Sequence, residues 1–179
     1  PVKALEAVMD GHQVMTMDEA CKVGDIFLTV TGGMKAVDSK HFENMKDGAI
    51  VANSGHFNVE INVEALEEMS EARREVREFV DEYTLEDGRK VFLLAQGRLI
   101  NLGAAEGHPP SVMDMSFANQ ALAGEYIVQN HNDLDPGVYT LPEEVDSDIA
   151  SIKLDAMGMT FDVLTEEQDI YLNSWESGT

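Results

Sequence analysis

The chain has 179 residues, enough for one hydrophobic core or slightly more. Its 12 Lys and Arg residues against 34 Asp and Glu residues give a formal net charge of −22, which opposes binding to nucleic acid or to an anionic membrane. A solvated acidic surface is the simplest interpretation, and adaptation to a salty cytoplasm is a sharper one. No apolar run approaches the ~18 residues of a membrane span, and we recognise no signal peptide.

The single cysteine, Cys21, excludes an internal disulfide and suits a reducing compartment. It falls in a predicted helix, so we expect a structural thiol rather than a nucleophile. With no membrane segment and no basic surface, we expect a cytoplasmic protein without a membrane or nucleic-acid partner. No His, Cys, Asp or Glu group has metal-ligand spacing, so no metal site is expected.

The first part of the chain alternates helices with short apolar strands. The predicted helices are 2–9, 17–23, 37–45 and 61–70, and the predicted strands are 26–31 and 49–52. The strand 26–31 is almost continuously apolar or β-branched, which is typical of a strand buried on both faces of a parallel sheet. The alternation predicts an α/β sheet with right-handed crossovers.

After residue 73 charged residues and extended runs predominate. The Glu86-Asp87-Gly88 turn between the extended runs 83–85 and 91–94 predicts a hairpin. The carboxylates from Glu71 to Glu82, like those that follow Pro142, resemble solvated faces. Helices are predicted for the rest of the chain over 111–128, 142–157 and 166–175.

The residues at the ends of the strands are the candidates for a site. Thr31-Gly32-Gly33 follows the first strand, where open α/β sheets bind ligands, although it could be an ordinary turn. Asn53-Ser54-Gly55-His56 follows the second; a lone loop histidine is usually a satisfied polar residue, but the close Asn-Ser-Gly turn favours a site.

The most informative stretch runs from Leu94 to Pro110 and combines glycines, a carboxamide, a histidine and a helix-opening proline. A core strand does not need so many polar and backbone-permissive residues at its end, so the stretch indicates a binding site. Asn101 could recognise a carboxamide, because its side chain donates and accepts at once, although by its chemistry alone it would be a strand-exit cap.

These motifs resemble those of the S-adenosyl-L-homocysteine hydrolase family, whose members carry Gly-Arg-Leu-x-Asn-Leu followed by Gly-His-Pro. The likeness continues through 111–120 and reaches back through 45–57 to 4–11. It implies an α/β fold in which residues 1–107 form an incomplete, Rossmann-type NAD-binding parallel sheet with helices. Residues 108–157 would then be a helical segment of the substrate domain, and 158–179 an oligomerisation segment.

The resemblance also implies functional residues, with NAD as the cofactor and adenosine as part of the substrate. The implied NAD contacts are Lys3, Thr31, Gly32, Gly33, Ser54, Gly55, His56, Asn101 and His108. The implied adenosine contacts are His56, His108, Met113 and Phe117. Met113 and Phe117 lie one helical turn apart. Such a pair belongs to the hydrophobic core in most proteins, but in this family it packs around the adenine. Gly33 replaces the family's usual Asn, and Pro110 its usual Ser.

The activity implied is reversible hydrolysis of S-adenosylhomocysteine to adenosine and homocysteine, with NAD oxidising the ribose 3′-hydroxyl before elimination and water addition. The Gly-x-Gly-x-x-Gly turn and the family's proton-transferring residues do not occur in the chain. We therefore expect the C-terminal portion of a short-tailed, homotetrameric enzyme, with no catalytic residue of its own, little affinity for NAD and no activity alone.

Two other classes of function stay open. A 2-hydroxyacid dehydrogenase on a similar sheet would show an Arg and a Glu-His pair at the expected strand exits, and the sequence does not show them. A non-catalytic relative that acts only in assembly would be recognised from the sequence upstream of Pro1.

Overall fold

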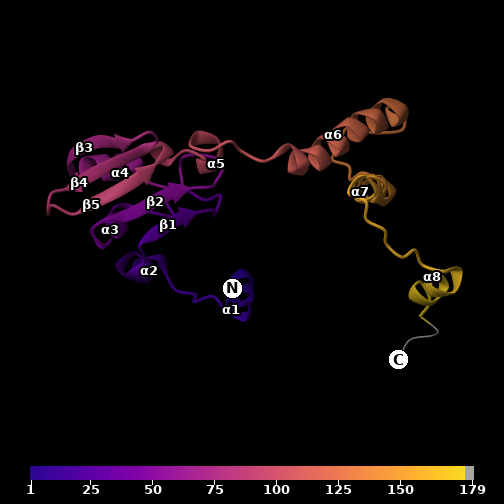
Figure 1. Ribbon diagram of the computed structural model, residues 1–179, viewed down its shortest axis with the longest axis horizontal. Helices are drawn as coiled ribbons and strands as arrows, with labels where there is room; N and C mark the ends of the chain where they lie inside the picture. Colours follow the sequence, from indigo (N-terminus) through magenta and orange to yellow (C-terminus); the bar gives the residue numbers. More distant parts are fainter. Residues whose placement is uncertain (176–179) are drawn as a thin grey trace. The chain divides into compact units, whose positions relative to one another are not determined.

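The computed structural model describes residues 1–175 and separates the chain into two compact units, the first ending at Gly107 and the second beginning at His108. The first unit contains the sheet, and the second is helical (Figure 1). Among the described residues, no helix is both long and apolar enough to cross a membrane.

A five-stranded sheet organises the first unit, in the strand order β1-β2-β5-β4-β3. Three strands are parallel, namely β1 (Ile26–Thr29), β2 (Ala49–Asn53) and β5 (Lys90–Leu94). Two antiparallel strands extend this core, namely β4 (Val80–Leu85) and β3 (Ser70–Arg77). This mixed sheet with its helices confirms the predicted α/β class, and the antiparallel pairing of β4 with β5 confirms the hairpin at Asp87-Gly88. Because β1, β2 and β5 run in one direction, their carboxyl ends meet at one edge of the sheet.

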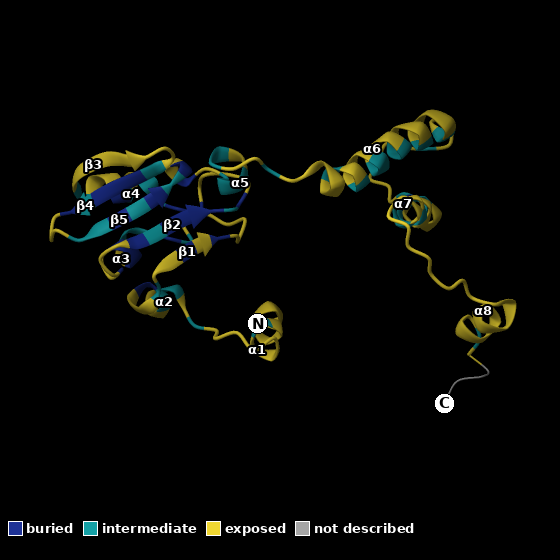
Figure 2. Ribbon diagram, in the orientation of Figure 1, coloured by how far each residue is buried: buried dark blue, intermediate teal, exposed yellow. Residues whose placement is uncertain are grey.

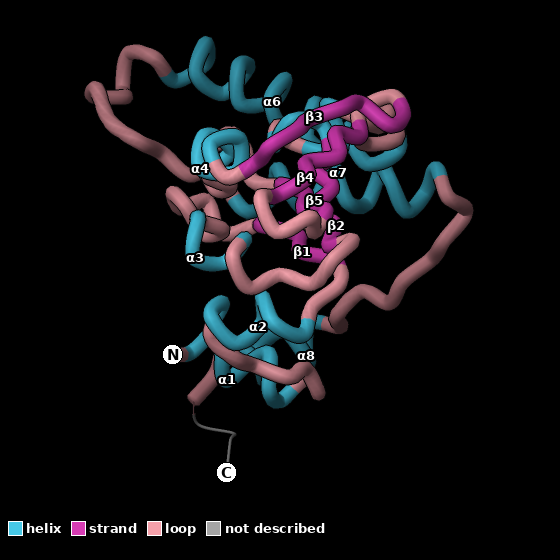
Figure 3. Tube along the Cα trace, turned by 90° about the vertical axis from the view of Figure 1, so that its left-hand side faces the viewer, coloured by secondary structure: helices cyan, strands magenta, loops and turns pink. Residues whose placement is uncertain are grey.

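The helices of this unit are short, and they are α1 (Val2–Met9), α2 (Met17–Val23), α3 (Ser39–Phe42), α4 (Val63–Glu68) and α5 (Ile100–Gly103). Helices α3 and α4 lie on the same side of the strands (Figure 3). Phe42 and Leu66 from these helices pack against Val51 and Leu93 of the sheet, and all four side chains are buried. The core also includes Cys21 of α2, as expected of a structural thiol.

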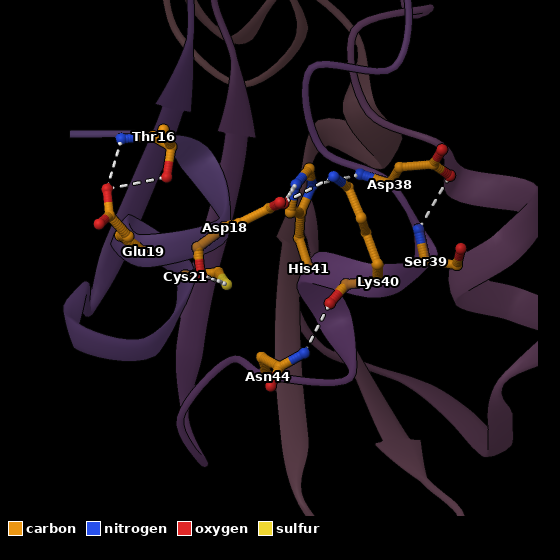
Figure 4. Close-up of polar contacts among 9 residues, drawn as sticks. All are labelled: Thr16, Asp18, Glu19, Cys21, Asp38, Ser39, Lys40, His41 and Asn44. Atoms are coloured by element: carbon orange, nitrogen blue, oxygen red, sulfur yellow. Dashed lines mark hydrogen bonds and ion pairs between the residues drawn. The ribbon is translucent and has the colours of Figure 1, made fainter.

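Helices α2 and α3 are joined by a polar cluster (Figure 4). His41 donates from Nε2 to the Asp18 carboxylate over 2.9 Å, because its Nδ1 already accepts from the backbone N–H of Asp38 over 2.9 Å. Lys40 Nζ lies 2.7 Å from the same carboxylate. Lys40 first and His41 second lower the pKa of Asp18 below its ordinary value of 3.8. The cluster fixes α3 on α2 and leaves no ring nitrogen of His41 free for another role.

The expectation that the first strand is buried on both faces was wrong. Ile26 is 70% exposed and Leu28 is 56% exposed, whereas the alternating residues Phe27 and Thr29 face the helices and are buried. Side chains alternate across a strand, so a strand covered on one face only must expose every second residue. An apolar run alone does not distinguish the two cases.

Strand β3 was not predicted, and two carboxylates beside it were misread as solvated. Asp81 and Glu82 of β4 are buried, because Arg73 and Arg74 of β3 lie over them at 3.2 Å and 2.8 Å, respectively. The ion pairs let charged side chains fill positions that would otherwise be apolar. A strand stabilised in this way carries no apolar alternation for sequence analysis to detect.

Two predicted helices are shorter than expected. Val37 forms an isolated parallel bridge with Ile61, so both residues are extended, and the helices begin after them at Ser39 and Val63. The second helix also ends early, because Ser70 is the first residue of β3.

The helices of the second unit are α6 (Pro110–Asn130), α7 (Glu143–Ala156) and α8 (Glu166–Leu172), close to the predicted positions. Helix α6 packs on α7, and Lys153 of α7 forms a 2.6 Å ion pair with Asp114 of α6. The carboxylates that follow Pro142 are exposed, as predicted. These helices are largely exposed, whereas buried residues concentrate in the sheet (Figure 2).

We expect Leu93→Ala to destabilise the protein by about 2–5 kcal/mol, because it leaves a cavity at the centre of the sheet where Leu93 is fully buried. Leu28→Ala is the matched control: the same atoms are removed from the exposed face of β1, and the expected loss is under ~1 kcal/mol. Urea denaturation followed by circular dichroism measures both. Similar losses from the two variants would contradict the one-sided core.

Candidate functional site

The candidate site lies where the three parallel strands end. The turn 31–33 follows β1, the loop 53–57 follows β2, and a short 3-10 helix (Ala95–Gly97) leads from β5 toward α5. An isolated parallel bridge between Asn53 and Leu99 holds the last two segments together. The carboxyl edge of a parallel sheet is where ligands bind in open α/β folds.

Asn53 connects these three strand ends through a single carboxamide that is 0% exposed. Its Oδ1 accepts from Thr29 Oγ1 of β1 over 3.0 Å and from the Gly55 N–H over 2.6 Å. Its Nδ2 donates to the carbonyl of Phe57 over 2.9 Å and to that of Gly97 over 3.0 Å. The carboxamide therefore uses both its donors and its acceptor, as a buried amide must.

Glu60 fixes the turn after β1. Its side chain is 1% exposed, and Oε2 accepts from both the backbone N–H and the hydroxyl of Thr31, each over 2.8 Å. Its Oε1 accepts from the Gly32 N–H over 2.7 Å. Burial alone would raise the pKa of Glu60, but the hydrogen bonds from Thr31 and Gly32 outweigh it and lower the pKa below 4.5. The carboxylate is thus ionised at neutral pH.

Gly55 places the turn after β2 directly against this carboxylate. A Cβ atom at residue 55 would lie 2.6 Å from Cδ of Glu60 and 2.9 Å from Oδ1 of Asn53. No side chain fits between them, so glycine is required for close packing rather than for its backbone angle. Asn53, Gly55 and Glu60 therefore form one rigid unit beneath the two turns.

The exit of β5 is a strained turn. Ala95, Gln96 and Gly97 have φ angles of 48°, 57° and 75°, a left-handed run that costs non-glycine residues of order 1–3 kcal/mol each. The bond from Asn53 to the Gly97 carbonyl and one from the Arg98 guanidinium to the Ala95 carbonyl, at 3.1 Å, hold it in place. The turn redirects the chain into α5, which carries Asn101.

A cleft of about 460 Å³ opens between the second and third strand exits. Its lining residues are His56, Phe57, Asn58, Arg98, Leu99, Leu102 and Gly103. The rings of His56 and Phe57 meet edge to face, with centroids 4.5 Å apart. Next to the lining residue Leu102, Asn101 has a buried Oδ1 that finds no hydrogen-bond partner among residues 1–175. A buried acceptor without a donor is costly, and Asn101 itself is not among the residues that line the cleft.

The structure gathers some of the predicted site residues and not others. Thr31, Gly32, Ser54 and Gly55 lie on the turns held by Glu60 and Asn53, and His56 lines the cleft. Gly33 continues the first turn, its N–H donating to the Thr31 hydroxyl over 3.0 Å. For these residues, the contact with a cofactor stays a prediction.

The remaining predicted residues are on other elements. Lys3 lies on α1, where it pairs with Glu6 at 2.8 Å. His108 is exposed at the start of the second unit, and Phe117 on α6 is 58% exposed, with Met113 half-buried one turn before it. Nothing in these contacts assigns a ligand to them, and their roles stay predictions. Within residues 1–175, no group of three or more His, Cys, Asp or Glu side chains is arranged to hold a metal ion.

Sequence reasoning missed the two residues that support the site. Asn53 was visible as the first polar residue after an apolar strand, but not as its central hydrogen-bonding group. Glu60 had one signal, a carboxylate placed between Val59 and Ile61. Neither signal names the partners, which lie up to 44 residues away along the chain.

Comparison with known proteins identifies the family of the chain. The family model described as "S-adenosyl-L-homocysteine hydrolase, NAD binding domain" matches residues 1–107. The chain belongs to this family. The match confirms the NAD-binding domain that the family resemblance implied, and with it NAD as the cofactor of that domain.

Relatives match the whole chain. It is 62% identical over 179 residues to the adenosylhomocysteinase of Aquifex aeolicus, and it covers 43% of that protein. It is 59% identical to the adenosylhomocysteinases of Gloeobacter violaceus and Saccharolobus solfataricus, again over its full length, covering 42% and 43% of them. The chain therefore spans less than half the length of the curated relatives it matches.

We expect the contribution of Glu60 to stability to depend on pH. Its pKa is lower in the folded state, so its stabilisation is fully present above the unfolded value of 4.5 and disappears as the pH falls through the lower folded value. Glu60→Gln should cost roughly 1.5–3 kcal/mol at neutral pH, because hydrogen bonds to a charged acceptor are lost.

The measurement is urea denaturation of both proteins between about pH 7 and about pH 3. The gap between wild type and Glu60→Gln should narrow below pH 4.5. The exposed Glu71→Gln serves as the matched control and should show almost no gap at any pH. A gap for Glu60→Gln that stays constant down to the lowest pH would contradict the ionised state of the buried carboxylate.

Proposed function

We propose that this chain forms part of an adenosylhomocysteinase, which reversibly hydrolyses S-adenosylhomocysteine to adenosine and homocysteine. The observation that carries the proposal is the match of the whole chain, at 59–62% identity, to relatives of that name. In this proposal, the first unit supplies the nicotinamide side of the NAD site, and the second supplies residues that surround the adenosine.

The residues at the strand exits fit NAD. The Oδ1 of Asn101, which has no partner in the described part of the chain, is an acceptor that the carboxamide of nicotinamide could satisfy. A Cβ at Gly32 would meet open space, so the missing side chain allows a flat ring or a sugar to approach the backbone of the first turn. When bound, NAD supplies the hydride acceptor for oxidation of the ribose 3′-hydroxyl.

The other residues of the cleft would position the substrate sugar and limit water. His56 stands at the edge of the cleft, oriented by Phe57, where its imidazole can hydrogen-bond a sugar hydroxyl. Leu99 and Leu102 give the cleft apolar walls. His108, Met113 and Phe117 would complete the adenosine side.

The proposal extends to assembly and location. Residues 108–157 would belong to the substrate domain, and 158–179 would serve as an oligomerisation segment of a homotetramer, although residues 176–179 lie outside the described part of the chain. Exposed apolar side chains of the segment, among them Phe161, Ile170 and Trp175, support this role. The buried free thiol of Cys21 is compatible with a cytoplasmic location.

The direct test uses the natural protein, that is, the enzyme of which this chain is proposed to form part. It is incubated with S-adenosylhomocysteine and NAD, and the products are measured. We expect adenosine and homocysteine in equal amounts, the latter detected with a thiol reagent. Oxidation of 2-hydroxy acids instead would favour a dehydrogenase, and failure to act on either substrate would favour a role in assembly alone.

For Asn101→Ala in the natural protein, we expect weaker NAD binding, by ~1–3 kcal/mol, and slower oxidation, because the carboxamide pair in a dry site is lost. Calorimetry measures the binding of NAD. The absorbance of the reduced cofactor measures the rate of oxidation. Asn44→Ala removes an exposed carboxamide and is the matched control. Unchanged NAD occupancy and turnover in Asn101→Ala would reject the role of Asn101.

A further inference from the structure

Among the described residues, the buried carboxylate of Glu60 has no cationic partner. The ion pairs of residues 1–175 involve other acidic groups, including the buried Asp81 and Glu82, each of which pairs with an arginine. In that part of the chain, Glu60 is held by N–H and O–H groups of Thr31 and Gly32 in the turn after β1, and by the side chain of Thr29 at the end of that strand. Burying a charge without a counter-ion costs several kcal/mol, and a neutral acceptor could hold the same turn, as Asn53 holds its neighbours.

The position of this charge suggests its purpose. The carboxylate touches two turns at once: Thr31 and Gly32 donate to it, and Gly55 packs against it so closely that no Cβ would fit. It therefore lies directly behind the backbone to which the nicotinamide side of the cofactor is assigned above. Removing Glu60 would both release the first turn and open space beneath the second.

We propose that Glu60 is a positioning residue of the cofactor site, whose buried anion fixes the turns after β1 and β2 and favours the oxidised form of the dinucleotide. The inference rests on the proposed function. The nicotinamide ring carries a positive charge when oxidised and none when reduced. A fixed negative charge close behind it stabilises the oxidised form selectively.

The test compares binding of NAD⁺ and NADH to the natural protein and to Glu60→Gln, by calorimetry and by fluorescence of the reduced cofactor. The glutamine keeps the size of the side chain but removes the charge and one acceptor. We expect NAD⁺ to bind at least about tenfold more weakly and NADH no more than about threefold more weakly. The control Glu71→Gln removes the same charge from an exposed position on β3 and should change neither affinity.

A second variant separates charge from geometry. Glu60→Asp keeps the anion but withdraws it by one methylene, so both affinities should fall together while the preference for NAD⁺ remains. This variant also decides the matter if Glu60→Gln does not fold, which thermal unfolding would reveal. Wild-type affinities for both cofactors in Glu60→Asp would overturn the positioning role.

The remaining outcomes distinguish this inference from the proposed function. Equal weakening of NAD⁺ and NADH in Glu60→Gln would overturn the role of the charge, because a purely structural residue affects both forms alike. A wild-type protein that binds NAD⁺ tightly, with Glu60→Gln unchanged, would overturn the inference and leave the proposed function intact. A wild-type protein that binds neither form would overturn both.

Discussion

The hydrogen bonds of one buried carboxamide hold the candidate site together. Asn53 accepts from β1, donates to the exit of β5 and turns its own strand exit back on itself through Gly55. The parallel register places Asn53 opposite Thr29, which brings these groups within reach. Because each partner belongs to a different segment, the carboxamide converts three independent loops into one surface, and a change in any strand would be transmitted to the other two.

This network also explains how the left-handed turn after β5 persists. A run of positive φ angles at Ala95 and Gln96 is unfavourable on its own, and the chain would relax unless its surroundings fixed it. The bond to the Gly97 carbonyl fixes its far end. The turn leads into α5, on which the buried Oδ1 of Asn101 has no hydrogen-bond partner among the described residues. Backbone strain at Ala95 and Gln96 and the buried acceptor of Asn101 therefore both reduce stability, and both lie in the segment that follows β5.

The sequence predicted the turns better than the groups that support them. The motifs around His56 and Asn101 are local, and polar or glycine residues after an apolar strand indicate a site without knowledge of the fold. Glu60 accepts hydrogen bonds from Gly32 and Thr31, which lie 28 and 29 positions earlier in the chain. Nothing in the intervening sequence specifies that these residues come together. The same reason explains β3, whose arginines make sense only once Asp81 and Glu82 lie beside them. The exposed face of β1 was missed because an apolar run does not report which face is covered.

The two kinds of buried carboxylate in this sheet obey different physics. Asp81 and Glu82 are neutralised by arginines that reach solvent, so their burial is compensated locally and serves the edge of the sheet. Within residues 1–175, Glu60 is compensated by dipoles and not by a cation, in a chain whose net charge of −22 already disfavours another anion. Dipoles of backbone N–H groups stabilise a carboxylate without cancelling its field, whereas a cation would cancel it. A carboxylate whose field is to act on a neighbouring ligand must therefore be held by backbone dipoles rather than by a cation, and Glu60 is held by such dipoles.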